Sequence, residues 1–331
     1  MDISLATFIS GKETFSDDFN ELQEYLKKYH NVQAYVFTDE YIDEIPNSII
    51  QINMPHTSKY LRIMRIVEES LNDSILFIDN DIIVDKDAVN RFLSEYREGE
   101  YALAWGRIGT TINTGFVPAL IEIDKILSHN IIRPCLWKLG VGISLPGQIF
   151  VLNKKYFLGC MQARDTVYDD LALGVVLKKN HFPFFQSKEY LGTEMPKQNI
   201  HELIRQRKRW AQGYSETLYN NRKDSILRYI LIHGFAYHFL WIPVWCGIIY
   251  MLVNRLILSA MVLVLLISSV LSWGKAKRFL VAFQYIFVFP FVHLNWLLAF
   301  LKNLYCSFIV SAKYSCGFSN LLNPSIIVNE I

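Results

Sequence analysis

Three long runs without Asp, Glu, Lys or Arg dominate the last third of the sequence. They cover residues 229–253, 256–274 and 279–301, which are 25, 19 and 23 residues long. A transmembrane helix needs about 20 mostly apolar residues to cross a hydrocarbon core about 30 Å thick, because backbone groups in lipid must bond within their own helix. We therefore expect three membrane spans near these runs. Buried helices of a large soluble core are the alternative, but three consecutive runs of this length rarely occur there.

The charged residues are unevenly distributed along the chain. The formal net charge is only +2, yet the residues after Asp224 include a single acid and seven basic residues. Basic clusters at 205–228 and 275–278 lie two predicted crossings apart, so both can face the cytoplasm. We expect a cytoplasmic domain over residues 1–228 and an integral membrane module over residues 229–331. A composition with 52% hydrophobic and 19% charged residues excludes a disordered or nucleic-acid-coating protein, and we expect no nucleic-acid partner.

The first 228 residues alternate between short β-branched or aromatic runs and segments with helical periodicity. The predicted strands cover residues 3–9, 32–37, 48–52, 75–78 and 101–105. The predicted helices cover residues 19–29, 61–71 and 88–96, with Asp85 as the cap of the last one. Alternating strands and helices predict an α/β fold with a mostly parallel sheet, in which ligands bind beyond the carboxyl ends of the strands.

A pair of carboxylates follows one of these buried runs. The segment Phe77-Ile78-Asp79-Asn80-Asp81 places Asp79 and Asp81 one residue apart. Alternate residues of an extended chain point the same way, so both can present oxygens to one divalent cation that holds a substrate diphosphate. An isolated motif of this kind is also typical of a turn with solvated or capping acids, and that alternative stays open.

A second acid pair, Asp169 and Asp170, opens an apolar segment with helical character. Acids are favoured at a helix N-terminus by the helix dipole, so capping alone explains them as well as a catalytic role does. A carboxylate at this position is equally suited to act as a general base.

The third motif, Gln206-Arg207-Lys208-Arg209-Trp210, lies just before the first charge-free run. Gln206, Arg209 and Trp210 share one helix face, because they are spaced i, i+3 and i+4. That face offers an amide, a guanidinium suited to phosphate and an aromatic surface suited to a sugar ring. A basic cluster that stops before a membrane span, with an interfacial tryptophan, is the simpler explanation of the same residues.

The ordered combination of these motifs resembles the family 2 glycosyltransferases, in particular the membrane-integrated branch that includes cellulose, chitin and hyaluronan synthases. The resemblance runs from about Ser4 to Leu301, and 36 residues separate Asp170 from Gln206. It implies a GT-A fold followed by the membrane helices. Two departures are an acid pair that reads Asp-Asp rather than Glu-Asp, and a first strand without the usual Pro-x-Tyr-Asn ending.

The resemblance also implies a role for each motif residue. Asp81 would bind Mg²⁺ or Mn²⁺ on the nucleotide diphosphate, and Asp79 and Asp169 would contact the nucleotide-sugar. Asp170 would be the catalytic base. The remaining assignments place Asp39 at the nucleoside, Gln206 and Arg209 at the diphosphate, and Trp210 at the acceptor sugar.

The resemblance implies an inverting β-glycosyltransferase that uses a nucleotide-activated sugar, with UDP as the expected nucleotide. The expected product is a capsular or extracellular polysaccharide made at the membrane, and single addition to a polyprenyl- or lipid-linked acceptor is the alternative. Nucleotidyl transfer and a degenerate membrane scaffold are the other classes that the motifs leave open. Three spans are few for a polymer channel, so we expect a homo-oligomer or a partner export subunit.

Overall fold

The computed structural model describes residues 1–10, 14–111, 115–161, 166, 168–272 and 276–315. In this part of the chain a single sheet of eight strands forms in the order β3-β2-β1-β4-β7-β6-β8-β5. The strands are β1 Asp2–Phe8, β2 Asn31–Thr38, β3 Ile49–Asn53, β4 Ser74–Ile78, β5 Ile82–Val84, β6 Leu103–Thr110, β7 Ile149–Asn153 and β8 Phe184–Glu194.

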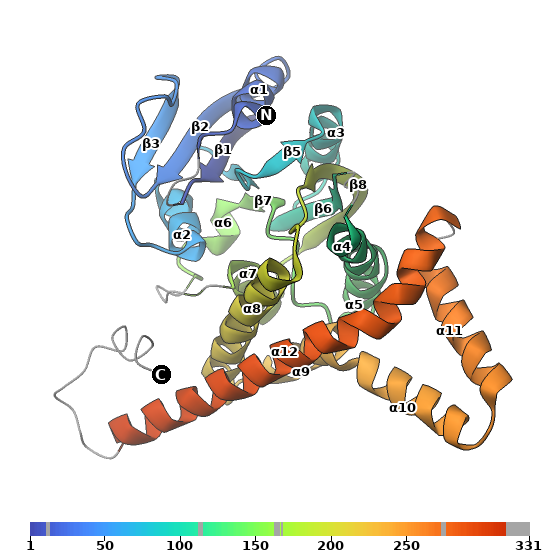
Figure 1. The fold of residues 1–331 in the computed structure, drawn as a ribbon. Helices are drawn as coiled ribbons and strands as arrows, with labels where there is room; N and C mark the ends of the chain where they lie inside the picture. Colours follow the sequence, from blue (N-terminus) through green and yellow to red (C-terminus); the bar gives the residue numbers. More distant parts are fainter. Residues whose placement is uncertain (11–13, 112–114, 162–165, 167, 273–275, 316–331) are drawn as a thin grey trace.

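Helices cover both faces of the sheet and then extend away from it (Figure 1). Those near the sheet are α1 Asp17–Leu26, α2 Lys59–Glu69, α3 Lys86–Arg97, α4 Phe116–Ile126, the π-helix η1 Leu127–Ile132, α5 Arg133–Lys138, α6 Lys154–Phe157 and α7 Asp169–Lys179. The remaining ones are α8 Ile200–Asn220, α9 Leu227–Gly234, the π-helix η2 Phe235–Phe239, α10 Trp241–Val253, α11 Ile257–Leu271 and α12 Ala276–Ser315.

The α/β fold is confirmed, and the sheet is mixed, with four parallel and three antiparallel strand pairs. Strand β1 runs parallel to β2 and β4, β2 runs parallel to β3, and β6 runs parallel to β8. Strand β7 is antiparallel to both of its neighbours, β4 and β6, and β5 is antiparallel to β8. Strands β5, β7 and β8 were not predicted. Strand β5 has only three residues, and β7 and β8 are placed in the sheet by partners remote in the sequence.

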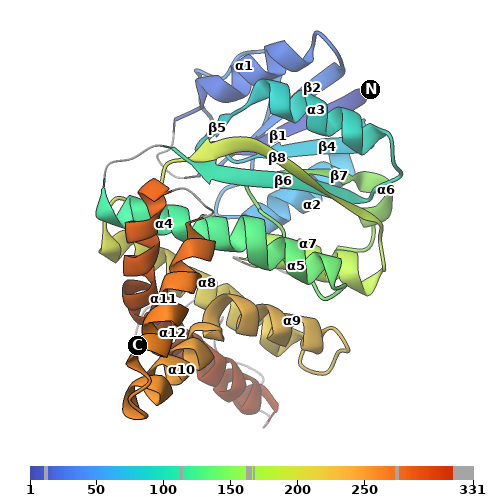
Figure 2. The ribbon, with the colours of Figure 1, turned by 90° about the vertical axis from the view of Figure 1, so that its right-hand side faces the viewer.

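The apolar stripes of the helices explain the layering. Helices α1 and α3 lie on one face of the sheet, while α2, α5 and α7 lie on the other (Figure 2). Fully buried Phe92 of α3 and Leu22 of α1 pack on the first face, and fully buried Phe77 and Trp105 pack on the second. As expected, Asp85 caps α3 by accepting a hydrogen bond of 2.9 Å from the backbone of Ala88.

The three expected membrane spans are not confirmed. Within the described residues one helix, Arg278–Ile309, is long and apolar enough to cross a membrane. The first expected span is a pair of helices, Leu227–Phe239 and Trp241–Val253, bent by 47°, which adds a second crossing only when the pair counts as one span. Helix α11 has 15 residues, about 22 Å of helix, which is short of a hydrocarbon core. Residues 273 and 274 of the second expected span lie outside the described residues.

Helix α12 packs directly on the N-terminal part of the chain. Its Ile286 and Phe289 share an apolar cluster with Leu120 of α4, and its Trp296 lies 5.4 Å from the ring of Tyr214 on α8. Only 33% of its most apolar window is buried, so most of that surface is open. The long apolar helix is therefore part of the wall of the α/β domain, and the domain boundary at residue 228 remains a prediction.

Gly174 allows α7 to pack closely against the backbone at Ile143. A Cβ added at Gly174 would lie 1.6 Å from the carbonyl oxygen of Ile143. We expect Gly174→Ala to lower the free energy of unfolding by about 1–3 kcal/mol or more, since a backbone contact cannot give way. Thermal unfolding of the purified protein checks this. Gly247→Ala is the control, because a Cβ there meets nothing within 4 Å, and equal melting temperatures for the two variants would contradict the prediction.

Candidate active site

A cavity of about 450 Å³ brings the three sequence motifs together. It lies beneath the sheet, between the end of β4, the start of α7 and the middle of α8. The candidate residues in its wall are Asp79, Asp81, Asp169, Asp170, Gln206, Arg209 and Trp210. Carboxylates about 90 residues apart in the sequence therefore face one space, as the spacing argument requires.

The first acid pair lies where β4 ends. The backbone N–H of Asp79 donates to the carbonyl of Gln148 at 2.8 Å, which continues the pairing of β4 with β7 for one more residue. The N–H of Ile82 then donates to the carbonyl of Asp79 at 3.2 Å, so the chain turns at once into β5. The motif is thus a turn, as the simpler interpretation states, and a turn that projects both carboxylates into the cavity. Burial raises the pKa of Asp79 to about 7, although the Lys59 ammonium opposes the shift.

Lys59 links the two acid pairs, and the sequence argument missed it. Its ammonium lies 2.6 Å from Asp79 Oδ1 and 3.3 Å from Asp169 Oδ2, and it donates to the carbonyl of Gly147 at 2.6 Å. Burial lowers the pKa of Lys59, but Asp169 and Asp79 outweigh it, so the pKa lies above its usual value. The helix dipole disfavours a cation in the first turn of a helix. The position of Lys59 directly after the cap Ser58 is therefore unusual, and this was the sequence signal that could have identified Lys59 as a site residue.

The second acid pair begins α7, as predicted. Asp170 Oδ1 accepts a hydrogen bond of 2.8 Å from the backbone of Leu171. Burial raises the pKa of Asp170 to about 7, and the charge of Asp169 adds to the shift while Arg133 and Lys59 oppose it. A Cβ added at Gly147 would lie 3.3 Å from Asp170 Cβ, so the loop backbone runs close against the pair. This environment gives a carboxylate that can accept a proton near neutral pH.

The third motif lies on α8, whose first turn is capped by Asn199 through a hydrogen bond of 3.0 Å from Glu202 N. Gln206, Arg209 and Trp210 all line the cavity, in agreement with their predicted common face. Arg207, which was not among the predicted site residues, stacks against one face of the Trp210 ring, with its guanidinium carbon 4.1 Å from the ring centroid.

Arg207 also connects α8 to two other helices. Its guanidinium lies 2.5 Å from Asp124 of α4, and the hydroxyl of Tyr285 on α12 donates to the same carboxylate at 2.8 Å. Arg207 therefore supports the Trp210 ring, and its own partner Asp124 is hydrogen-bonded to the long apolar helix α12.

Asp39 does not line the cavity. Its carboxylate lies 2.5 Å from the guanidinium of Arg62, which is 1% exposed. Arg62 also donates to the carbonyls of Ile9 at 2.9 Å and Met54 at 3.1 Å, so it ties together the chain beyond β1, β2 and β3. The role of Asp39 at the nucleoside stays a prediction.

The residues of the cavity suit a divalent metal only if the substrate completes the coordination shell of that metal. Within the described residues no group of three or more His, Cys, Asp or Glu side chains could hold a metal ion. Asp81 lines the cavity and offers the hard oxygen ligands that Mg²⁺ and Mn²⁺ prefer. Diphosphate oxygens and water would have to supply the remaining ligands, which is how Mg²⁺ is usually bound next to phosphates.

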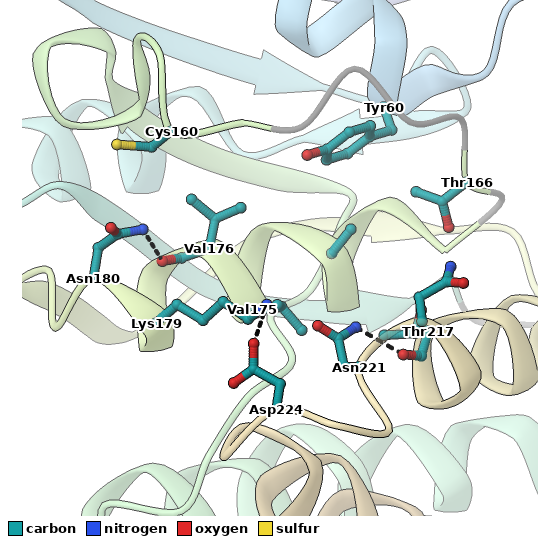
Figure 3. A pocket seen from close by; sticks show the side chains of 12 residues that line it. Tyr60, Cys160, Thr166, Val175, Val176, Lys179, Asn180, Thr217, Asn221 and Asp224 are labelled. Atoms are coloured by element: carbon teal, nitrogen blue, oxygen red, sulfur yellow. Dashed lines mark hydrogen bonds and ion pairs between the residues drawn. The ribbon is translucent and has the colours of Figure 1, made fainter.

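A second cavity, of about 320 Å³, lies on the other side of α7 (Figure 3). The ion pair between Lys179 and Asp224, 2.7 Å apart, lies in its wall. The amides of Asn180 and Asn221 donate to helix carbonyls at 2.8 and 2.7 Å, so they are already satisfied. None of the motif carboxylates lines this cavity, so the candidate chemistry belongs to the larger one.

The Lys59 ion pairs predict that removing this cation destabilises the protein, and more so at high pH than at low pH. We expect Lys59→Met to destabilise the protein by about 3–5 kcal/mol, because it leaves two partly buried carboxylates without their cation. Without that cation the pKa of Asp79, which burial already raises to about 7, rises further. The folded state then binds more protons than the unfolded chain, so the loss is larger at about pH 8 than at about pH 5.

Lys155→Met is the matched control, because Lys155 is 70% exposed and its ion pair with Asp73 at 2.6 Å contributes little. Thermal unfolding of both variants at the two pH values is the measurement. Equal losses for the two lysines, or a loss that shrinks as pH rises, would contradict the assignment.

Known proteins resemble this chain in sequence pattern and in fold. The sequence model of the family described as Glycosyl transferase family group 2 matches residues 74–306. Mannosyltransferase PcManGT from Pyrobaculum calidifontis, solved with GDP-Man and Mn²⁺, has a similar fold, with a TM-score of 0.54 at 10% sequence identity over 91% of this chain and 86% of that one.

A weaker likeness is found with glucosyl-3-phosphoglycerate synthase from Mycobacterium tuberculosis, solved with Mn²⁺, UDP and phosphoglyceric acid. The TM-score is 0.45 at 14% identity over 63% of this chain and 76% of that one. No curated protein matches the sequence significantly. The family match covers well over half of the chain and includes all three motifs, so this protein is a glycosyltransferase that belongs to glycosyl transferase family group 2.

Proposed function

We propose that this protein transfers a sugar from a nucleotide-activated donor to an acceptor hydroxyl with inversion at the anomeric carbon. The convergence of two acid pairs and the α8 motif on one cavity carries this proposal. Nucleotidyl transfer also uses paired carboxylates, but it has no need of an aromatic platform such as Trp210 beside the base.

The chain supplies a partner for each charge that changes during such a transfer. Asp170 accepts the proton of the acceptor hydroxyl as that oxygen forms its bond to the anomeric carbon. The bond from this carbon to the diphosphate breaks, and the electron pair leaves with the nucleoside diphosphate. Arg209 and Gln206 bind the diphosphate, since a guanidinium and an amide suit its oxygens. Attack from the face opposite the leaving group inverts the configuration, so an α-linked donor gives a β-linkage.

Asp81 would hold Mg²⁺ or Mn²⁺ against the donor diphosphate, with Asp79 and Asp169 close to the nucleotide-sugar. When bound, the metal supplies positive charge to the departing diphosphate. PcManGT, which shares the fold, was solved with Mn²⁺ and GDP-Man. The choice of UDP rests on the resemblance to polysaccharide synthases, so a test of the donor must include both UDP- and GDP-sugars.

The apolar surface of the C-terminal helices supports a location at the membrane, with the catalytic domain in the cytoplasm. Large side chains there are open to solvent, among them Val253, Leu258 and Phe291 at 76%, 75% and 69% exposed. Patches of this kind mark contact with lipid or with another protein. Helix α12 lines both this surface and the cavity, through His293. An acceptor that reaches the site from the membrane side is either a growing capsular or extracellular polysaccharide or a lipid-linked saccharide.

The small number of candidate membrane spans limits how this protein could export a polymer. One or two crossings are too few to enclose a polymer channel within one chain, so a processive enzyme of this design needs a second copy or a partner subunit. An enzyme that adds one sugar to a lipid-linked acceptor needs neither.

The assignment of Asp170 predicts a defined pH dependence. A base must be deprotonated, so we expect transfer to fall as pH decreases through about 7, following the pKa of Asp170 beside Asp169, Arg133 and Lys59. Asp170→Asn should reduce turnover by at least about 100-fold and leave donor affinity unchanged. Rates of nucleotide release against pH and donor binding by calorimetry are the measurements. Normal turnover, or loss of donor binding in this variant, would remove Asp170 from this role.

A donor screen tests the reaction class. Purified full-length protein is incubated with UDP- and GDP-sugars and Mn²⁺, and the released nucleotide is identified. We expect release of a nucleoside diphosphate, abolished by EDTA, and separation of labelled products decides between a ladder and a single addition. Release of pyrophosphate would establish nucleotidyl transfer instead, and Asp81→Asn is the matched variant that should lose the metal response.

A further inference from the structure

The membrane side of the catalytic cavity is built from residues that the mechanism above does not use. We call this the inner wall and define it as Arg133, Ser144, His233, His238 and His293, all of which line the same cavity as Asp170. Ser144 Oγ lies 3.3 Å from His233 Nδ1, and the rings of His238 and His293 are 5.8 Å apart. These residues come from the start of α5, the loop before β7, α9, η2 and α12, so the wall joins the α/β domain to the apolar helices.

Arg133 is a buried cation that has no carboxylate partner among the described residues. The residue is 8% exposed, and its Nε and Nη1 have no hydrogen-bond partner within the described residues. A guanidinium in such a position is costly unless something pairs with it. The other buried cations of the cavity are paired: Lys125 lies 2.8 Å from Glu194, and Arg207 lies 2.5 Å from Asp124. The missing partner of Arg133 is therefore expected from a ligand.

The imidazoles of the inner wall add further unsatisfied polar atoms. His233, His238 and His293 are 1%, 5% and 9% exposed. Within the described residues, Nε2 of His233, both ring nitrogens of His238 and Nδ1 of His293 have no hydrogen-bond partner. They do not form a metal site. An imidazole nitrogen can donate to a hydroxyl or accept from one, so this part of the wall suits a polyhydroxylated ligand.

The position of Arg133 separates it from the donor. Arg133 lines the cavity together with Asp170 and the three imidazoles, and its charge opposes the rise in the pKa of Asp170. The groups assigned to the donor diphosphate, Gln206 and Arg209, come from α8 instead. A ligand that offers a hydroxyl to Asp170 and an anionic group to Arg133 must therefore be the acceptor.

We propose that the inner wall is an acceptor subsite for an anionic saccharide, which presents a hydroxyl to Asp170 and a carboxylate or phosphate to Arg133. This assignment rests on the proposed glycosyl transfer. The carboxylate would belong to a uronic acid and the phosphate to a sugar phosphate. Both present the anionic oxygens that a guanidinium binds, and the hydroxyls of either would meet the imidazoles.

A binding experiment tests the subsite without a donor. Thermal unfolding of the full-length protein in detergent is followed with glucuronate, glucose 6-phosphate or glucose at equal millimolar concentration and constant ionic strength. We expect at least one of the two anionic sugars to raise the melting temperature, since a ligand that binds the folded state stabilises it, and glucose to raise it less. The anion that acts identifies the source as a carboxylate or a phosphate.

Variants of Arg133 decide the assignment. Arg133→Gln should abolish the difference between anionic and neutral sugars, and Arg133→Lys should restore part of it. Arg91→Gln is the control for loss of a positive charge, because Arg91 is 59% exposed and pairs with Glu189 outside the cavity. No difference in the wild-type protein, or a difference that survives in Arg133→Gln, overturns the proposal.

Kinetics with the donor found in the screen provide an independent readout. We expect Arg133→Gln to raise the KM for the anionic acceptor about 10- to 100-fold, with the donor KM unchanged. An equal rise in the donor KM would move Arg133 to the diphosphate and overturn the subsite. If no donor releases a nucleotide, the proposed function fails, whereas the melting experiment still decides whether the inner wall binds an anionic sugar.

Discussion

The ammonium of Lys59 holds the site together, because it lies between two carboxylates that would otherwise repel each other. Its contacts with Asp79, Asp169 and the carbonyl of Gly147 join α2, the end of β4, the loop before β7 and the start of α7. A single cation thus fixes the relative positions of both acid pairs. The pKa values of Asp79 and Asp170, both raised to about 7, show that burial competes with this neutralisation throughout the cavity.

The long apolar helix α12 is connected to the same site by side-chain contacts. Tyr285 of α12 hydrogen-bonds to Asp124, Asp124 pairs with Arg207, and Arg207 lies under the Trp210 ring. A second link on α12 joins Arg278 to Glu122 of α4. The exposed apolar surface of α12 is therefore connected through three side chains to Trp210, the proposed platform for the acceptor sugar.

Much of the fold followed from local pattern. The strands predicted at 3–9, 32–37 and 75–78 became β1, β2 and β4, and Asp85 caps α3, because alternation and capping depend on near neighbours. Strands β7 and β8 escaped prediction, since their place in the sheet is set by partners far away in the chain. The prediction of three membrane spans was not confirmed, for a related reason. Absence of charge does not reveal that one run bends by 47° or that another forms a helix of 15 residues.

The sequence by itself determined the chemical groups of this protein and their order: two acid pairs, a helix face with an amide, a guanidinium and an indole, and an apolar C-terminal part. These are properties of residue type and of spacing within a few turns of chain. The tertiary structure brings the groups into one cavity, places Lys59 between one carboxylate of each acid pair, pairs Asp39 with Arg62 outside the cavity wall, and buries Arg133 without a carboxylate partner among the described residues. Each of these facts concerns the distance between residues remote in sequence, and that distance is set by how the sheet and its helices pack.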